Sequence, residues 1–128
     1  MPRDLDLPSR IYHLALRDEW QQARDGGAAY RRSTLGRSLE DEGYIHCSFA
    51  NQVQAIADLV YRGRRDIVLL EIDPARLRAE VRVEALDGGE QAFPHIYAPL
   101  PVEAVVVATG VPVGADGRLI VETLLSHG

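Results

Sequence analysis

One short segment, residues 66–72, limits the folds open to this 128-residue chain. It contains an unbroken Ile-Val-Leu-Leu run, and Asp73-Pro74 ends it in a turn. A strand that is apolar on both sides must be covered on both faces, so it belongs at the centre of a sheet. We therefore expect a core sheet built around this segment.

Other strands are expected on both sides of this segment in the sequence. Over residues 10–16, alternation places Tyr12, Leu14 and Leu16 on one side and leaves His13 on the other. Apolar runs, alternation and turn residues predict further strands at residues 44–48, 81–84, 93–97 and 104–109, and an edge strand over 118–124 after an Asp116-Gly117 hairpin turn.

Two short helices are predicted in the first half of the chain. Asp18 is a candidate N-cap for a helix through Arg24, with Trp20 and Ala23 directed to the core. The second helix runs to about Tyr61 with Ser48 or Asn51 as cap, and its apolar stripe comprises Val53, Ile56, Ala57 and Val60.

The remaining segments complete a single domain over residues 1–128. Residues 1–9 are expected to be a loose lead-in, residues 28–42 a long polar loop, and 87–89 a turn. Helices first and mostly strands afterwards favour an α+β fold with a largely antiparallel sheet. The absence of a Gly-rich turn between strand and helix argues against a Rossmann nucleotide site.

The composition excludes several classes of function. A net charge of −5 does not fit a dedicated nucleic-acid binder. The single cysteine, Cys47, excludes an internal disulfide. No apolar run is long enough to span a membrane or to act as a signal peptide, so we expect a cytoplasmic protein. The chain has no lysine, which excludes Schiff-base chemistry and a phosphate-loop lysine.

Three of the four histidines, His13, His46 and His95, lie in predicted strands. Alternation puts Tyr44 and Ser48 on the same face as His46, and puts Phe93 and Tyr97 with His95. We expect the three imidazoles to meet at one pocket. The alternative is that each histidine satisfies a buried backbone group by itself.

Metal binding and cysteine catalysis are weaker alternatives. His13, His46, Cys47 and His95 would supply four zinc ligands, but His46 and Cys47 point to opposite faces and no zinc-ligand spacing occurs. We therefore expect no metal. Cys47 cannot pair with His46 as a nucleophile for the same reason, and a lone small cysteine on an apolar face is typical of a core.

Charged and aromatic residues complete the candidate site. Glu84 lies at a strand end, where it can hydrogen-bond a sugar hydroxyl or stabilise a cation, whereas Glu71 lies inside an apolar strand and needs a partner. Trp20, Tyr30, Tyr44 and Tyr97 can stack on a planar ligand, although core packing is the default for Trp20. Arg31, Arg32 and Arg37, in the polar loop, are candidates for contacting phosphate.

Four blocks together resemble a bacterial family called domain of unknown function 952. They are Ile11-Tyr12-His13-Leu14, Glu42-Gly43-Tyr44-Ile45-His46-Cys47-Ser48, Val68-Leu69-Leu70-Glu71-Ile72-Asp73 and Phe93-Pro94-His95-Ile96-Tyr97-Ala98-Pro99-Leu100. The match runs from about Arg10 to Thr109 and leaves residues 110–128 outside it. The family usually has Gly where this chain has Ala98.

The resemblance implies the fold of ADP-ribosyltransferases, in which a split antiparallel sheet binds NAD in its cleft. It implies that His13 holds a ribose hydroxyl and that Tyr44, His46 and Ser48 contact the nicotinamide side. Glu84 or His95 would orient or activate the acceptor.

Three kinds of function stay open at this point. The first is an enzyme that acts on NAD or an ADP-ribosyl group through a His/Tyr/Ser/Glu pocket. The second is a non-catalytic module that binds a small, nucleotide-like molecule. The third is a zinc-stabilised protein. A 2′-phosphotransferase acting on RNA would need a basic face, which the charge does not favour.

Overall fold

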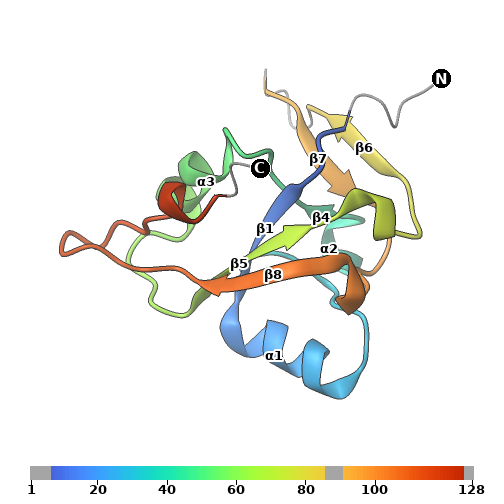
Figure 1. The fold of residues 1–128 in the computed structure, drawn as a ribbon, viewed down its shortest axis with the longest axis horizontal. Helices are drawn as coiled ribbons and strands as arrows, with labels where there is room; N and C mark the ends of the chain where they lie inside the picture. Colours follow the sequence, from blue (N-terminus) through green and yellow to red (C-terminus); the bar gives the residue numbers. More distant parts are fainter. Residues whose placement is uncertain (1–6, 86–90, 126–128) are drawn as a thin grey trace.

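A computed structural model describes residues 7–85 and 91–125 and shows an α+β protein with antiparallel sheets, as expected (Figure 1). Two sheets have three strands each, in the orders β1-β5-β8 and β4-β7-β6, and a third consists of β2 and β3. The predicted lead-in and the predicted 87–89 turn lie largely or wholly outside the described residues. Among the described residues no helix is both long and apolar enough to cross a bilayer.

The first sheet has its most apolar strand in the middle, as the sequence predicts. Strand β5 (Ile67–Ile72) is buried at all six positions and pairs with β1 (Ile11–Leu16) on one side and β8 (Val105–Gly110) on the other. Because β5 has strands on both edges and core on both faces, even Glu71 is buried at 7% exposure.

Helices cover both faces of this sheet. Helix α1 (Arg17–Gly26) buries Trp20 and Ala23, as predicted, in one cluster with Leu70. Helix α3 (Val53–Val60) packs in a second cluster with Leu69, on the opposite face. The alternation of β5 therefore divides the interior into two cores, one on each side of the sheet.

The predicted helix caps are wrong. Helix α1 begins directly after β1 with Leu16 at the N-cap, and Arg17 N–H donates to the carbonyl of Asp66 at 2.7 Å. Gln52, not Ser48 or Asn51, precedes α3, and neither helix has a side-chain cap hydrogen bond. The strand-to-helix connection and tertiary contacts fix these helix starts, so cap residues are not required there.

Residues 28–42 are not the predicted loop. They contain β2 (Arg32–Thr34), β3 (Arg37–Ser38) and the one-turn helix α2 (Leu39–Glu42). Ser38 caps α2 in a reciprocal capping box with Asp41. Such short elements carry too few apolar residues to give a periodic signal, which explains the missed assignment.

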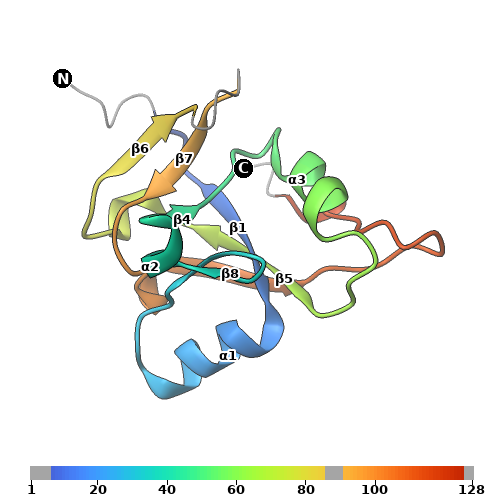
Figure 2. The same cartoon turned by 180° about the vertical axis from the view of Figure 1, so that it is seen from behind.

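The second sheet lies beside the first (Figure 2). It consists of β4 (Ile45–His46), β7 (Phe93–Ile96) and β6 (Val81–Glu84), with β7 in the centre. The predicted strands 81–84 and 93–97 are confirmed, whereas the strand predicted over 44–48 is shorter. Two single-turn 3₁₀ helices, Pro74–Arg76 and Val102–Ala104, flank the strands.

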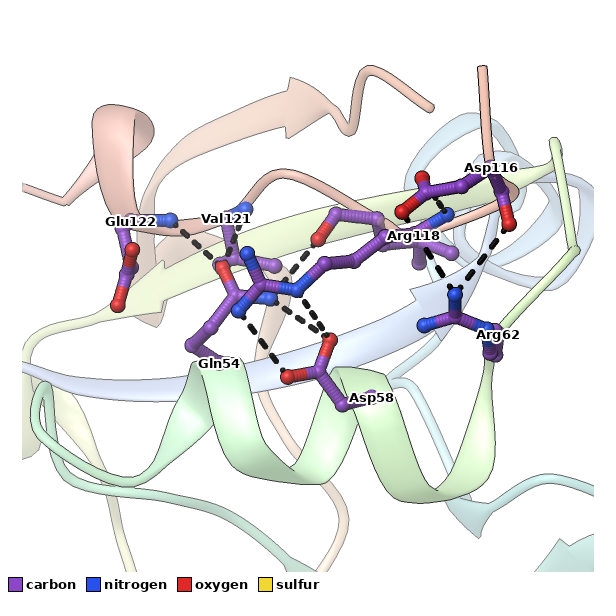
Figure 3. Close-up of polar contacts among 8 residues, drawn as sticks. Gln54, Asp58, Arg62, Asp116, Arg118, Val121 and Glu122 are labelled. Atoms are coloured by element: carbon purple, nitrogen blue, oxygen red, sulfur yellow. Dashed lines mark hydrogen bonds and ion pairs between the residues drawn. The ribbon is translucent and has the colours of Figure 1, made fainter. Parts of the chain in front are cut away.

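The edge strand predicted over 118–124 is wrong. Only one bridge, between Val113 and Leu119, forms there, and Glu122–Leu124 is a 3₁₀ helix. The backbone of this segment does not pair with a strand; it hydrogen-bonds the side chain of Gln54 in α3 (Figure 3). Gln54 Nε2 donates to the carbonyl of Leu119 at 2.8 Å, and its Oε1 accepts from the amides of Val121 at 2.9 Å and Glu122 at 3.0 Å.

An ion pair reinforces this attachment. Arg118 binds the Asp58 carboxylate through two nitrogens, at 3.0 and 3.1 Å, and Asp58 also accepts from Gln54. The segment in turn contributes Leu119 and Val121, both fully buried, to the α3 core. The C-terminal segment is thus part of the second core, although it lies outside the family resemblance.

We predict that Gln54→Ala lowers the free energy of unfolding by about 2–4 kcal/mol, because it leaves buried backbone groups of the C-terminal segment unpaired. Urea denaturation measures the change. Gln22→Ala on the exposed face of α1 is the control, expected to stay within about 0.5 kcal/mol of the wild type. Equal losses in the two variants would contradict this role of Gln54.

Candidate functional site

A pair of backbone hydrogen bonds joins the two three-stranded sheets. Tyr12 N–H donates to the Ser48 carbonyl at 2.8 Å, and Ser48 N–H donates to the Tyr12 carbonyl at 2.7 Å. Because Ser48 follows β4 and Tyr12 lies in β1, this bridge brings the edge of one sheet against the edge of the other. We call it the sheet junction. The candidate residues lie around it.

His13 is buried in the junction with both ring nitrogens bonded. Its Nδ1 lies 2.7 Å from the carbonyl of His46, and its Nε2 lies 2.9 Å from the Tyr30 hydroxyl. A carbonyl only accepts, so Nδ1 carries the proton and Nε2 accepts from Tyr30. Burial lowers the pKa of His13 to about 4, so the ring is neutral at pH 7.

His46 and Ser48 lie next to His13 and line a small hollow at the junction. Its wall also includes Ser33 and, from α3 and its end, Ile56 and Tyr61. The His46 amide donates to the Ser33 hydroxyl at 3.1 Å, which ties β4 to β2. Burial, and secondarily the neighbouring His95, lowers the pKa of His46 to about 4.

One face of the second sheet is rich in polar and aromatic groups. In the register, His46 lies directly opposite His95, and His95 lies opposite Arg82. Their neighbours two positions along each strand project from the same side. We call this surface the polar face; its residues are Tyr44, His46, Arg82, Glu84, Phe93, His95 and Tyr97.

Glu84 is the centre of the hydrogen bonding on the polar face. One of its oxygens, Oε1, accepts from His95 Nδ1 at 3.1 Å and also from the Tyr97 hydroxyl. The Tyr97 hydrogen bond, followed by that from His95, lowers the pKa of Glu84, so the carboxylate stays ionised at neutral pH. The same contact raises the pKa of Tyr97 and keeps it a donor.

Aromatic packing holds these groups in place. Tyr44 stacks on His95 with ring centroids 4.2 Å apart, and it lies 5.5 Å from the ring of Tyr97. The Arg82 guanidinium lies 4.3 Å from the centre of the Tyr97 ring. His95 is 3% exposed, whereas the Glu84 side chain is 25% exposed. The carboxylate is therefore a fixed, negatively charged group of this face that solvent or a ligand can reach.

The structure places the three histidines in a row. His13 bonds the backbone of His46, and the His46 and His95 rings are 5.5 Å apart. His13 and His46 line the hollow, but His95 does not; it lies with Glu84 on the polar face. His46 belongs both to the hollow and to the polar face.

Other predicted site residues lie apart from this group. Arg31 is ion-paired with Glu40, at the surface, and Arg32 with Glu19 at 3.2 Å. Arg32 also lines a second hollow, which reaches Tyr30 and the other side of His13. Neither arginine belongs to the polar face, so both would have to exchange a carboxylate partner to bind phosphate.

The alternatives based on zinc and on cysteine find no support in the geometry. No group of three or more His, Cys, Asp or Glu residues is arranged to hold a metal ion within residues 7–85 and 91–125. Cys47 lies in the core at 1% exposure, and burial raises the pKa of its thiol. The thiol is thus an inert part of the packing.

Sequence reasoning missed Ser33 and Arg82, and it named Tyr30 only as a ring for stacking, not as a partner of His13. Tyr30 fixes the His13 ring, Ser33 fixes the position of His46, and Arg82 packs on Tyr97. Arg82 alternates with Val81 and Val83 and shares a side with Glu84, which could have placed it on the polar face. Nothing in the sequence around Tyr30 or Ser33 indicates that they reach the histidine strands.

We predict that His13 remains neutral, with the proton on Nδ1, down to about pH 5, because burial lowers its pKa to about 4. Nitrogen-15 NMR of histidine-labelled protein measures tautomer and titration, and the urea-unfolded chain, titrating near 6.5, is the control. Since the unfolded chain takes up the proton first, stability should fall as pH drops from about 6.5 to 4. A His13 midpoint near 6.5 in the folded protein would contradict the described burial.

The chain has relatives among known families and solved structures. A family model described as "Protein of unknown function (DUF952)" matches residues 14–108. The crystal structure of protein CC0527 from Caulobacter crescentus has a TM-score of 0.78 and 31% identity, and covers 90% of this chain and 96% of that one. Its solution NMR structure has a TM-score of 0.75 and 32% identity, with coverages of 94% and 100%. No curated protein gave a significant match. The family match and the near-complete overlap with a solved relative together show that this chain belongs to the DUF952 family.

Proposed function

We propose that this protein is an enzyme that binds NAD, or a related nucleotide, at the polar face and acts on the ADP-ribosyl group. The observation that carries the proposal is Glu84: an ionised carboxylate, partly exposed, held by two donors and surrounded by aromatic rings. The family resemblance stated above suggests the same class of ligand.

The chemistry of the ligand explains why such a carboxylate is useful. Cleavage of the bond between the ribose C1′ carbon and nicotinamide leaves positive charge on the sugar. A fixed negative group close to that carbon stabilises the transition state more than the ground state, which is the requirement for catalysis. His95 and Tyr97 hold Glu84 in one position, so little reorganisation is needed.

Neighbouring residues have chemistry suited to the rest of the nucleotide. Tyr44 and Phe93 offer ring surface for stacking, and the neutral ring of His46 can hydrogen-bond a ribose hydroxyl. Arg82 is the arginine of the polar face and is a candidate for the diphosphate, for which it would exchange its ion pair with Glu80, 3.1 Å away. His13 acts as a positioning residue, because its two ring nitrogens are already bonded.

A non-catalytic binding module is the second candidate. The junction hollow is small, about 10 Å³, and both ring nitrogens of His13 are already hydrogen-bonded, so neither is free to take part in a reaction. Such a module would bind the nucleotide on the polar face and release it unchanged. The two candidates differ in whether nicotinamide is released.

We predict that Glu84→Gln lowers the rate of nicotinamide release by about 100-fold or more and leaves NAD affinity within a few-fold, since the lost charge acts mainly in the transition state. Calorimetry measures binding, and chromatography measures nicotinamide. Glu103→Gln, an exposed carboxylate on the 3₁₀ helix Val102–Ala104, is the matched control.

The possible results separate the candidates. Binding without release by the wild type would support the module, and equal release by wild type and Glu84→Gln would remove Glu84 from the mechanism. No heat with NAD or ADP-ribose would contradict both.

A further inference from the structure

A groove separate from the polar face lies where the chain enters β1 and leaves β5. Residues 7–10 form one side of it, and residues from the turn 73–79 form the other. The two segments meet because Ile11, the first residue of β1, lies opposite Ile72, the last residue of β5. We call this cavity the end groove.

The end groove has the size and the lining of a small-molecule site. Its volume is about 570 Å³, whereas each of the two hollows beside His13 measures about 10 Å³. Pockets that bind small molecules typically have about 300–1,000 Å³ and mostly apolar walls, with a few polar groups that orient the ligand. The polar residues of the end groove are Ser9, Arg10 and Asp73, and the apolar ones are Leu7, Pro8, Pro74, Ala75, Leu77 and Ala79.

Arg10 is a positive charge without a negative partner. Of the arginines that the structure describes, all but Arg10 and the exposed Arg65 have a carboxylate within 4.0 Å. Arg10 Nη1 donates to the carbonyl of Ser9 at 2.8 Å. A guanidinium has five N–H donors, so most of them are left for a ligand.

The other charges beside the end groove are already balanced. The Asp73 carboxylate accepts from the amide of Ala75 at 3.0 Å and lies 3.5 Å from the Arg76 guanidinium. Further along the same segment, Arg78 and Glu80 each have an ion-pair partner. The end groove therefore combines apolar walls with one net positive charge, which selects for an anion.

We propose that the end groove binds a small carboxylic acid with an apolar chain, with the carboxylate on Arg10 and the chain along Leu7 and Leu77. The planar guanidinium matches the two oxygens of a carboxylate. One net positive charge suits the single charge of a carboxylate better than the charge of about −2 on a phosphate group. The end groove shares no residue with the polar face, so this site does not depend on the proposed function.

Titration of nitrogen-15-labelled protein with butyrate, hexanoate and octanoate, followed by NMR, tests the site. We expect saturable shifts at the amides of Ser9, Ala75 and Ala79, with affinity rising about tenfold for each two methylene groups. 1-Octanol has the same chain without the charge and should bind at least about tenfold more weakly than octanoate. No saturable shift with any of the acids, or equal affinity for octanol and octanoate, overturns the proposal.

Two substitutions locate the binding. Arg10→Gln should weaken octanoate binding about tenfold or more, whereas Arg65→Gln, at the other arginine without an ion pair, is the matched control and should leave it unchanged. Ala75→Phe, at an exposed position, should fill the end groove and abolish binding, and its spectrum reports whether the fold is kept.

Equal affinity in the wild type and Arg10→Gln, or octanoate shifts centred on the amides of His46 and His95, would also overturn the site. A failure to bind or cleave NAD counts against the proposed function alone and leaves the end groove as it is.

Discussion

The backbone bridge between Tyr12 and Ser48 is the contact on which the rest of the site depends. Its two hydrogen bonds, 2.8 and 2.7 Å long, join the sheet around β5 to the sheet around β7 at the histidine strands. His13 strengthens the bridge by donating to the His46 carbonyl. Without this junction the hollow would open, and His46 would lose its fixed position against His13.

The junction also separates two electrostatic environments a few ångströms apart. On its inner side, burial keeps His13 and His46 neutral at pH 7. On the polar face, Tyr97 and His95 keep Glu84 ionised. A fixed negative charge next to neutral hydrogen-bonding rings suits a reaction in which positive charge develops.

Sequence reasoning succeeds here where a residue's surroundings are set by strand alternation. The two sides of β1 and the common side of Glu84 and Arg82 follow from a period of two, whereas the central position of β5 follows from its unbroken apolar run. Sequence reasoning fails where long-range contacts replace local signals. The start of α1 is fixed by a hydrogen bond to the Asp66 carbonyl, and the C-terminal segment is held by hydrogen bonds to the Gln54 side chain. The same limit applies to the site: alternation puts His46 and Ser48 on one face, but only folding brings Tyr30 to His13 and Ser33 to His46.

Native-state hydrogen exchange at the amides of Tyr12 and Ser48 tests most directly whether the two sheets form one unit around the site. If the junction is intact, both amides exchange only through global unfolding, within about 1 kcal/mol of the β5 amide of Leu70. Exchange at Tyr12 and Ser48 through a separate opening, several kcal/mol easier than at Leu70, would show that the sheets part readily, and would contradict the account.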